Sequence, residues 1–210
     1  YVEYGYVPDD IGGSSVSVTL EYAYADASLA NLAEQLGDTE TAAELRERSN
    51  SWEELWYDET NFILPRFADG SFDTEISTET SFDRSGSFAE GSAWHYRFYA
   101  LHDLEAVVEK FGDELFEDTL ETFFEESSLV TPTPTGDLLP EPYYWHSNQP
   151  SIDAAFLFHA VDRPDRVAYW VNEVRNQKYG PEADGVPGND DGNTMSAWYV
   201  FTSIGLYPRI

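Results

Sequence analysis

Apolar residues recur at helical spacing along most of this chain, and three long loops interrupt the pattern. The loops cover residues 59–88, 131–149 and 180–193, which is too long for simple connections between packed helices. Their aromatic content argues against disorder and for a functional role. We therefore expect an all-α fold of about seven helices, arranged as stacked helical hairpins with few strands. The later helices are expected over residues 90–111, 113–126, 150–161, 164–178 and 194–205.

The first two helices have boundaries and faces that the sequence defines. The first is expected over residues 17–36 with Gly37 as its stop, and Asp38 or Thr39 is expected to cap the second. The segment after them is expected to be irregular, with a short hairpin at Asp69-Gly70. The expected apolar faces are Tyr22, Leu29, Leu32, Ala33 and Leu36 on the first helix, and Ala42, Leu45, Ser49, Trp52 and Trp56 on the second.

Charge excludes several classes of function. The 210 residues include 40 Asp and Glu against 11 Lys and Arg, a formal net charge of -29. Phosphate backbones and anionic membranes repel such a polyanion, so we expect no nucleic-acid partner. No apolar run approaches the roughly 18 residues of a membrane helix, and no signal peptide is visible. The chain has no cysteine, which excludes disulfides and thiolate metal sites.

The acidic residues lie along the whole chain rather than in one tail. Adaptation to high salt is the favoured explanation, because molar salt screens self-repulsion within about 3 Å and carboxylates keep the surface hydrated. A calcium-rich surface and an ordinary acidic protein are the alternatives. With so many acids, a carboxylate near a motif carries little weight by itself.

Three segments place polar groups and aromatic rings just before an expected helix. They are Phe88–Tyr96, Tyr143–Ser151 and Asp184–Gly192. Sugar-binding sites need this mixture, because rings stack on the apolar faces of sugars while carboxylates and amides bond the hydroxyls. The residues alone therefore indicate a carbohydrate-active protein on a helical scaffold.

Each segment also has a purely structural interpretation. A negative charge such as that of Glu90 is favoured at a helix N-terminus. The Asn189–Gly192 run suits a turn with a helix cap, and it lacks the alternating acids and terminal Glu of an EF-hand. His146 suits a partly buried histidine whose nitrogens are bonded, and Asn148 with Gln149 would cap the following helix.

Taken together, the segments resemble the glycoside hydrolase family 92 α-mannosidases, in the family's order and over nearly the whole chain. The residues that carry the resemblance are Gly5–Pro8, Val18–Tyr24, Glu90–Tyr96, His102-Asp103, His146–Ser151, Gly188–Gly192, Met195–Tyr199 and Gly205–Pro208.

This resemblance implies part of an (α/α)6 toroid and calcium-dependent, inverting exo-hydrolysis of terminal α-mannosides. Inversion uses a carboxylic acid that protonates the leaving oxygen and a second carboxylate that activates a water on the opposite face. By resemblance Glu90 is the general acid. Asp191 corresponds to the general base, with Asp190 as the close alternative.

The resemblance also implies a calcium ion and a mannose pocket. Asn148 and Gln149 are similar to the family's amide and carboxylate pair at the ion, with Gln149 where many members have Glu. Calcium binds oxygen ligands, so this pair suits it in type. The residues expected to contact the mannose are His102, Asp103, Trp94, His146 and Trp145.

Two departures from the family matter. Members are much longer, so residues 1–210 are expected to form a partial catalytic domain that lacks an N-terminal β-sandwich, a C-terminal remainder and a further acidic calcium ligand. Ser147 stands where some α-1,2-specific members carry an acid. The resemblance implies mannose-containing glycans as substrates and an extracellular or cell-surface location.

Two other hypotheses remain open. One is another inverting (α/α)6 glycosidase of the glucoamylase or trehalase type, and the other is a non-catalytic acidic module that binds carbohydrate or calcium. Half a toroid would leave apolar faces uncovered, so activity of this stretch alone is not expected.

Overall fold

A computed structural model describes residues 1–78, 86–130 and 141–208. Helices dominate these residues, and the only strands among them are β1 (Trp56–Tyr57) and β2 (Phe62–Ile63), which pair antiparallel. The expected hairpin at Asp69-Gly70 is confirmed, because Phe67 N–H donates to the Ser71 carbonyl at 2.8 Å and Arg66 bridges to Phe72.

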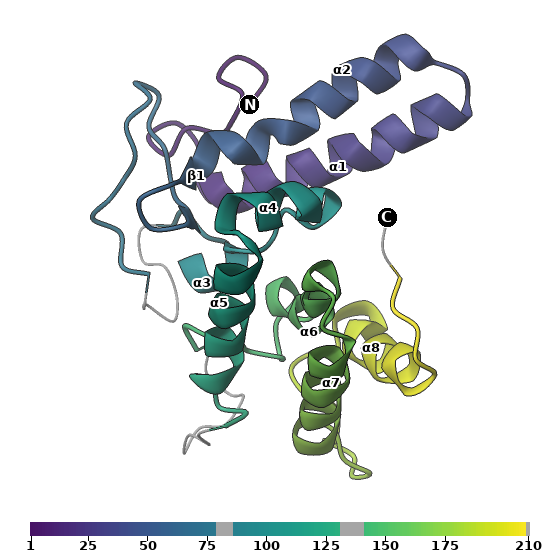
Figure 1. The fold of residues 1–210 in the computed structure, drawn as a ribbon. Helices are drawn as coiled ribbons and strands as arrows, with labels where there is room; N and C mark the ends of the chain where they lie inside the picture. Colours follow the sequence, from purple (N-terminus) through teal and green to yellow (C-terminus); the bar gives the residue numbers. More distant parts are fainter. Residues whose placement is uncertain (79–85, 131–140, 209–210) are drawn as a thin grey trace.

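The N-terminal part is a long helical hairpin, with α1 (Ser15–Gln35) and α2 (Thr39–Ser49) side by side (Figure 1). Gly37 takes a φ of 81° between them, and the Asp38 carboxylate accepts from Thr41 N–H at 3.1 Å, as the sequence predicts. The second helix does not continue to Trp56. It tightens into the 3₁₀ segment η1 (Asn50–Leu55) and then enters β1.

The predicted apolar face of α1 is wrong in most of its members. Tyr22, Leu29, Leu32 and Leu36 are between 49% and 77% exposed, and only Ala33 is buried. The buried face instead carries small side chains, which let two helices approach closely. It also carries Asp26, whose carboxylate receives two hydrogen bonds from Arg48 at 2.6 Å. The buried residues of α1 are Ser15, Val16, Ser17, Thr19, Leu20, Ala23, Asp26, Ala30 and Ala33.

The helix predicted over residues 90–111 is broken in two places. It forms α3 (Ala93–Tyr96), η2 (Leu101–Asp103) and α4 (Leu104–Phe111), while α5 (Asp113–Glu125) follows as predicted. The break follows Arg97, whose buried guanidinium donates to the carbonyls of Asn61 at 2.7 Å and Thr60 at 3.2 Å. These bonds satisfy the buried cation and hold the end of α3 against the turn that precedes β2.

The C-terminal part repeats this pattern of regular and broken helices. The predicted helix over 150–161 is divided into η4 (Gln149–Ser151), α6 (Ala154–Leu157) and η5 (Phe158–Val161). The predicted helix over 164–178 is confirmed as α7 (Pro164–Lys178), with proline at its first position. The last elements are η6 (Asp191–Asn193) and α8 (Thr194–Ser203).

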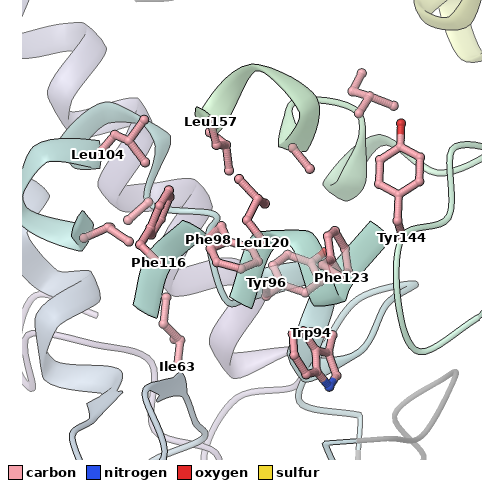
Figure 2. Close-up of a cluster of buried hydrophobic side chains, with 14 of the residues drawn as sticks. Ile63, Trp94, Tyr96, Phe98, Leu104, Phe116, Leu120, Phe123, Tyr144 and Leu157 are labelled. Atoms are coloured by element: carbon pink, nitrogen blue, oxygen red, sulfur yellow. The ribbon is translucent and has the colours of Figure 1, made fainter. Parts of the chain in front are cut away.

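One aromatic-rich core joins these elements. Figure 2 shows Phe116, Leu120 and Phe123 of α5 among Trp94, Tyr96 and Phe98. Ring pairs such as Phe98 with Phe116, at 5.6 Å between centroids, meet edge to face, a favourable geometry for aromatic pairs. None of the helices in the described ranges combines the length and apolar character that crossing a membrane requires.

Candidate active site

The three loop segments selected from the sequence meet in the structure. The Asn148 side-chain amide donates to the backbone carbonyl of Glu90. The neighbouring Gln149 donates from Nε2 to the Asp191 carboxylate at 2.8 Å. Adjacent residues of the middle loop therefore contact both the acid candidate and the base candidate, which are 101 positions apart in the chain.

Glu90 lies at a sharp backbone turn just before α3. Its φ of 49° is in the left-handed region, which is uncommon for a residue other than glycine and marks a constrained position. Ala89, next to it, is fixed from both sides, since its N–H donates to Ser17 Oγ and its carbonyl accepts from Tyr96 OH, each at 2.7 Å. The turn is held rigidly while the Glu90 side chain is exposed.

A capping box joins this turn to the middle loop. Ser92 N–H donates to His95 Nδ1 at 3.2 Å, so this nitrogen carries no proton and Nε2–H donates to the Tyr143 carbonyl at 2.8 Å. Ser92 Oγ also donates to the Pro142 carbonyl at 2.8 Å. Burial lowers the pKa of His95 to about 4, which keeps the ring neutral.

Asp190 and Asp191 are neighbours with different partners. The Asp190 carboxylate accepts from Ser196 N–H at 2.8 Å and from Ser196 Oγ at 2.7 Å, which ties it to the first turn of α8. These bonds lower the pKa of Asp190. Asp191 is exposed and accepts from Gln149 across the loops. The structural interpretation, a helix-associated acid, therefore applies to Asp190, while Asp191 faces the site.

Gly188 sets how closely the middle and last loops approach. Its φ is +65°, and a Cβ at this position would lie 2.6 Å from the Ser147 carbonyl oxygen. Any side chain would push the two loops apart. This contact lies one residue from Asn148 in one loop and three from Asp191 in the other, so it supports the Gln149–Asp191 bond.

His146 and Trp94 do not offer surface to a substrate. His146 is 0% exposed, and both of its ring nitrogens bond to tyrosine hydroxyls, as its structural interpretation anticipated. Trp94 is 9% exposed, packs on Phe62 and Phe123, and has Arg97 4.7 Å from its ring centre. The structure thus places Trp94 in the core, whereas Trp145 is half-buried and retains surface.

His102 and Asp103 lie apart from the three loops. His102 Nε2 contacts the Ser49 carbonyl at 3.0 Å, and Asp103 accepts from Trp52 Nε1 at 3.0 Å. Both line a groove beside Ala27. Ala27 is ten residues beyond Ser17, the α1 residue at the Glu90 turn, or about 15 Å along the helix. In the described ranges the contacts of this pair are with Ser49, Trp52 and Tyr24, none of which lies in the three loops.

The orientation of the Asn148 and Gln149 side-chain amides decides which of their atoms could bind a cation. A carbonyl and a carboxylate accept only, so the atoms that Asn148 and Gln149 direct at them are nitrogens. The oxygen of each amide takes no part in these two hydrogen bonds. Neutral oxygens of this kind suit calcium. Over the described ranges, no three His, Asp or Glu side chains gather to hold a metal ion. These two amides fit a calcium site as partial ligands.

Several groups that build the site have no role that the sequence predicts, although Tyr96 and Ser196 lie in stretches that carry the family resemblance. Ser17 and Tyr96 fix the Glu90 turn, Ser196 holds Asp190, and Tyr179 contacts His146. Each is a common residue type outside the three loops or at their margin. Only the tertiary fold identifies their roles.

Comparison with known proteins identifies the family of this chain. Residues 1–210 match the model of the glycosyl hydrolase family 92 catalytic domain. An uncharacterized secreted glycosidase of Arthroderma benhamiae is 25% identical over 227 residues, covering 99% of this chain and 27% of that protein.

Two solved structures from Bacteroides thetaiotaomicron are similar. The family 92 α-mannosidase BT3965, in complex with mannoimidazole, has a TM-score of 0.88 and 31% identity over 98% of this chain and 28% of its own. The family 92 inverting mannosidase BT2199 has a TM-score of 0.84 and 29% identity over 99% of this chain and 29% of its own. The chain therefore spans less than a third of the length of these relatives.

Proposed function

The chain belongs to glycosyl hydrolase family 92, and from this premise we propose that it supplies the acid and the base of an α-mannosidase. The observation that carries the proposal is the hydrogen-bonded path from Glu90 through Asn148 and Gln149 to Asp191. This path connects the loop that carries Glu90 and the loop that carries Asp191 to the adjacent amides of Asn148 and Gln149. The solved relatives, an α-mannosidase bound to mannoimidazole and an inverting mannosidase, support mannosides as substrates.

In this proposal Glu90 protonates the leaving oxygen and Asp191 takes a proton from the attacking water. Two carboxylates in these roles give inversion when a water fits between one of them and the sugar. Asp191 is preferred to Asp190 as the base, because Ser196 already engages both oxygens of Asp190. Gln149 Nε2 contacts one oxygen of Asp191, and within the described ranges this carboxylate has no other hydrogen-bond partner.

Calcium belongs to the same proposal. Asn148 and Gln149 would hold the ion through their amide oxygens, together with ligands from elsewhere in the protein. When bound, the ion would supply a positive charge that orders mannose hydroxyls. We expect chelation to lower activity, and calcium to restore it where magnesium does not, because magnesium is smaller and loses its water reluctantly.

The wider setting is also proposed. The helical pairs of this chain would form part of an (α/α)6 toroid, and a β-sandwich domain together with further chain would complete the pocket for exo-hydrolysis of terminal mannose. The coverage of the relatives supports this, since this chain spans 28% of BT3965. A secreted glycosidase among the relatives supports an extracellular or cell-surface location.

A mutational test separates the two roles. Glu90→Gln should lower kcat/KM on a mannobiose by about 10²–10⁴-fold, the usual contribution of acid catalysis. It should retain far more activity on an aryl mannoside with a good leaving group, which needs no protonation. Asp191→Asn should lose activity on both substrates equally, because both need the activated water.

The controls are a matched surface acid and a second sugar. Glu182→Gln changes an exposed carboxylate of the loop that also carries Asp191, and it should keep the rates of the parent protein. Turnover of α-glucosides in preference to α-mannosides would favour a glucoamylase- or trehalase-type enzyme. Full activity of both Glu90→Gln and Asp191→Asn would refute the proposed roles.

A further inference from the structure

A chain of hydrogen bonds centred on buried His146 runs close to the proposed site. Tyr144 OH contacts His146 Nδ1 at 2.7 Å, and His146 Nε2 contacts Tyr179 OH at 2.8 Å. Tyr179 OH in turn donates to the Met195 carbonyl at 2.9 Å. We call these four residues the histidine relay. It links the middle loop to the end of α7 and to the first turn of α8.

The direction of every bond in the relay follows from its last member. The Met195 carbonyl only accepts, so it uses the single hydroxyl proton of Tyr179. The Tyr179 oxygen must then accept, and His146 donates to it from Nε2–H. A neutral imidazole has one N–H, so Nδ1 accepts the proton of Tyr144. His146 is therefore the neutral Nε2–H tautomer.

The surroundings of His146 keep it in that form. The ring is 0% exposed and lies 4.5 Å from the Trp198 ring, edge to face. Trp198 is fixed in turn, because it stacks on Tyr179 and its Nε1 donates to the Ile152 carbonyl at 3.0 Å. Protonation of Nδ1 would break the bond from Tyr144.

The relay spans the same two segments as the contact at the site. His146 lies three residues before Gln149, and Met195 lies four residues after Asp191. The relay and the Gln149–Asp191 bond therefore close a ring between two short stretches of chain. Two cross-links over such a short span fix the separation of the stretches, which a single bond would leave adjustable.

We propose that His146 is a positioning residue that sets the approach of Gln149 to Asp191, and so aligns the base without touching substrate. The assignment of Asp191 as base rests on the proposed function, whereas the relay and its effect on Gln149 do not. Substrate contact, the role that the family resemblance suggests for His146, would need a ring nitrogen that the relay already uses.

The first test reads the tautomer by ¹H–¹⁵N NMR of the histidine rings. His146 should show a protonated Nε2 and a bare Nδ1 at pH 7. Exposed His159, which lies outside the relay, serves as the control. A protonated Nδ1 on His146 would overturn the relay.

The second test reads positioning without catalysis, through the side-chain amide signal of Gln149. Tyr179→Phe removes the acceptor of His146 Nε2–H, and it should shift this signal and speed its exchange with solvent. His146→Ala should do the same, with partial recovery in His146→Gln, which keeps a donor. Tyr169→Phe, an exposed tyrosine on α7, should leave the signal unchanged. An unaltered signal in Tyr179→Phe and His146→Ala would overturn positioning.

The third test is a double-mutant cycle on mannosidase activity. His146→Ala and Gln149→Ala should each lower kcat by about 10–100-fold, as expected for misalignment by about 1 Å, and His146→Ala should change KM little. The double variant should be no slower than the slower single variant. Losses that multiply would contradict action through Gln149. If the intact protein hydrolyses no mannoside, the proposed function fails, and the Gln149 signal still decides positioning.

Discussion

Asp190 and Asp191 show how far two adjacent carboxylates can differ. One is tied by Ser196 to the turn that starts α8, and the other accepts a bond from a separate loop. Sequence comparison left the choice of base between them open. The partners of each carboxylate separate a structural acid from one that faces the site.

Removing Asp190 should therefore lower the stability of the protein, whereas removing Asp191 should lower its activity. Asp190→Ala should lower Tm by about 2–4 °C, the shift expected for a lost helix-terminal bond in a domain of this size. Asp191→Ala should leave Tm within about 1 °C of the parent value, because the carboxylate is exposed and has one neutral partner. Thermal unfolding followed by circular dichroism measures both. A larger Tm loss in Asp191→Ala would contradict this division.

The buried histidines predict acid sensitivity at the residue scale. Burial depresses the pKa of His95 to about 4 and of His146 to about 3, below the value near 6.5 of an unfolded chain. The unfolded state thus takes up protons first as pH falls. The stability contributed by neutral rings is complete above pH 6.5 and is lost as pH falls to about pH 4 for His95 and to about pH 3 for His146, at about 1.4 kcal/mol per pH unit for each histidine.

Urea unfolding at several pH values tests this linkage. His95→Gln keeps an acceptor and a donor but does not titrate, so its unfolding free energy should fall less steeply between pH 6.5 and 4.5 than that of the parent protein. The difference in slope should be about 1.4 kcal/mol per pH unit. Equal slopes would show that His95 is not held neutral. His159→Gln, at an exposed position, is the control.

At the scale of elements, the site depends on the close packing of two loops. Gly188→Ala places a methyl group on the Ser147 carbonyl and requires a left-handed backbone. It should destabilise the protein by about 1–3 kcal/mol and should lower activity, because Gln149 moves away from Asp191. Gly192→Ala, also at positive φ but with nothing within 4 Å, is the matched control for backbone strain. Equal activity losses in the two variants would show that loop separation is not the cause.

Helical periodicity predicted the existence of the elements better than their breaks. Helices α5 and α7 agree with expectation because their ends carry local signals, Gly112 before one and Pro164 at the start of the other. The break after α3 depends on Arg97 bonding to carbonyls 36 and 37 residues away, which no local pattern reveals. Tertiary contacts therefore explain most of the differences.

The candidate site was predictable in part for a similar reason. The three loops combine acids, amides and aromatic rings, so their meeting could be anticipated. The role of each ring could not, because stacking on sugar and packing in a core use the same side chains. Trp94 is in the core, and the apolar face assigned to α1 is exposed. The buried face of α1 carries small residues such as Ala23 and Ala30, which a pattern of large apolar side chains does not reveal.

At the scale of the whole molecule, the charge of -29 predicts dependence on salt. At about 0.1 M salt, exposed carboxylates interact over about 10 Å, and at 1 M over about 3 Å, so their repulsion is relieved. Tm should therefore rise as NaCl increases from 0.1 to 2 M. A variant with exposed Glu114, Asp118 and Glu125 of α5 changed to amides should show a smaller rise. The same salt response in both proteins would exclude carboxylate repulsion as the cause.

The central claim is that Glu90 and Asp191 act as an inverting acid and base on α-mannosides. The most direct measurement is ¹H NMR of the sugar first released from an α-mannoside by the protein, with Asp191→Asn in parallel. The account predicts that β-mannose appears first and later equilibrates to the α-anomer, and that Asp191→Asn releases almost none. Release of α-mannose first, or undiminished release by Asp191→Asn, would contradict it.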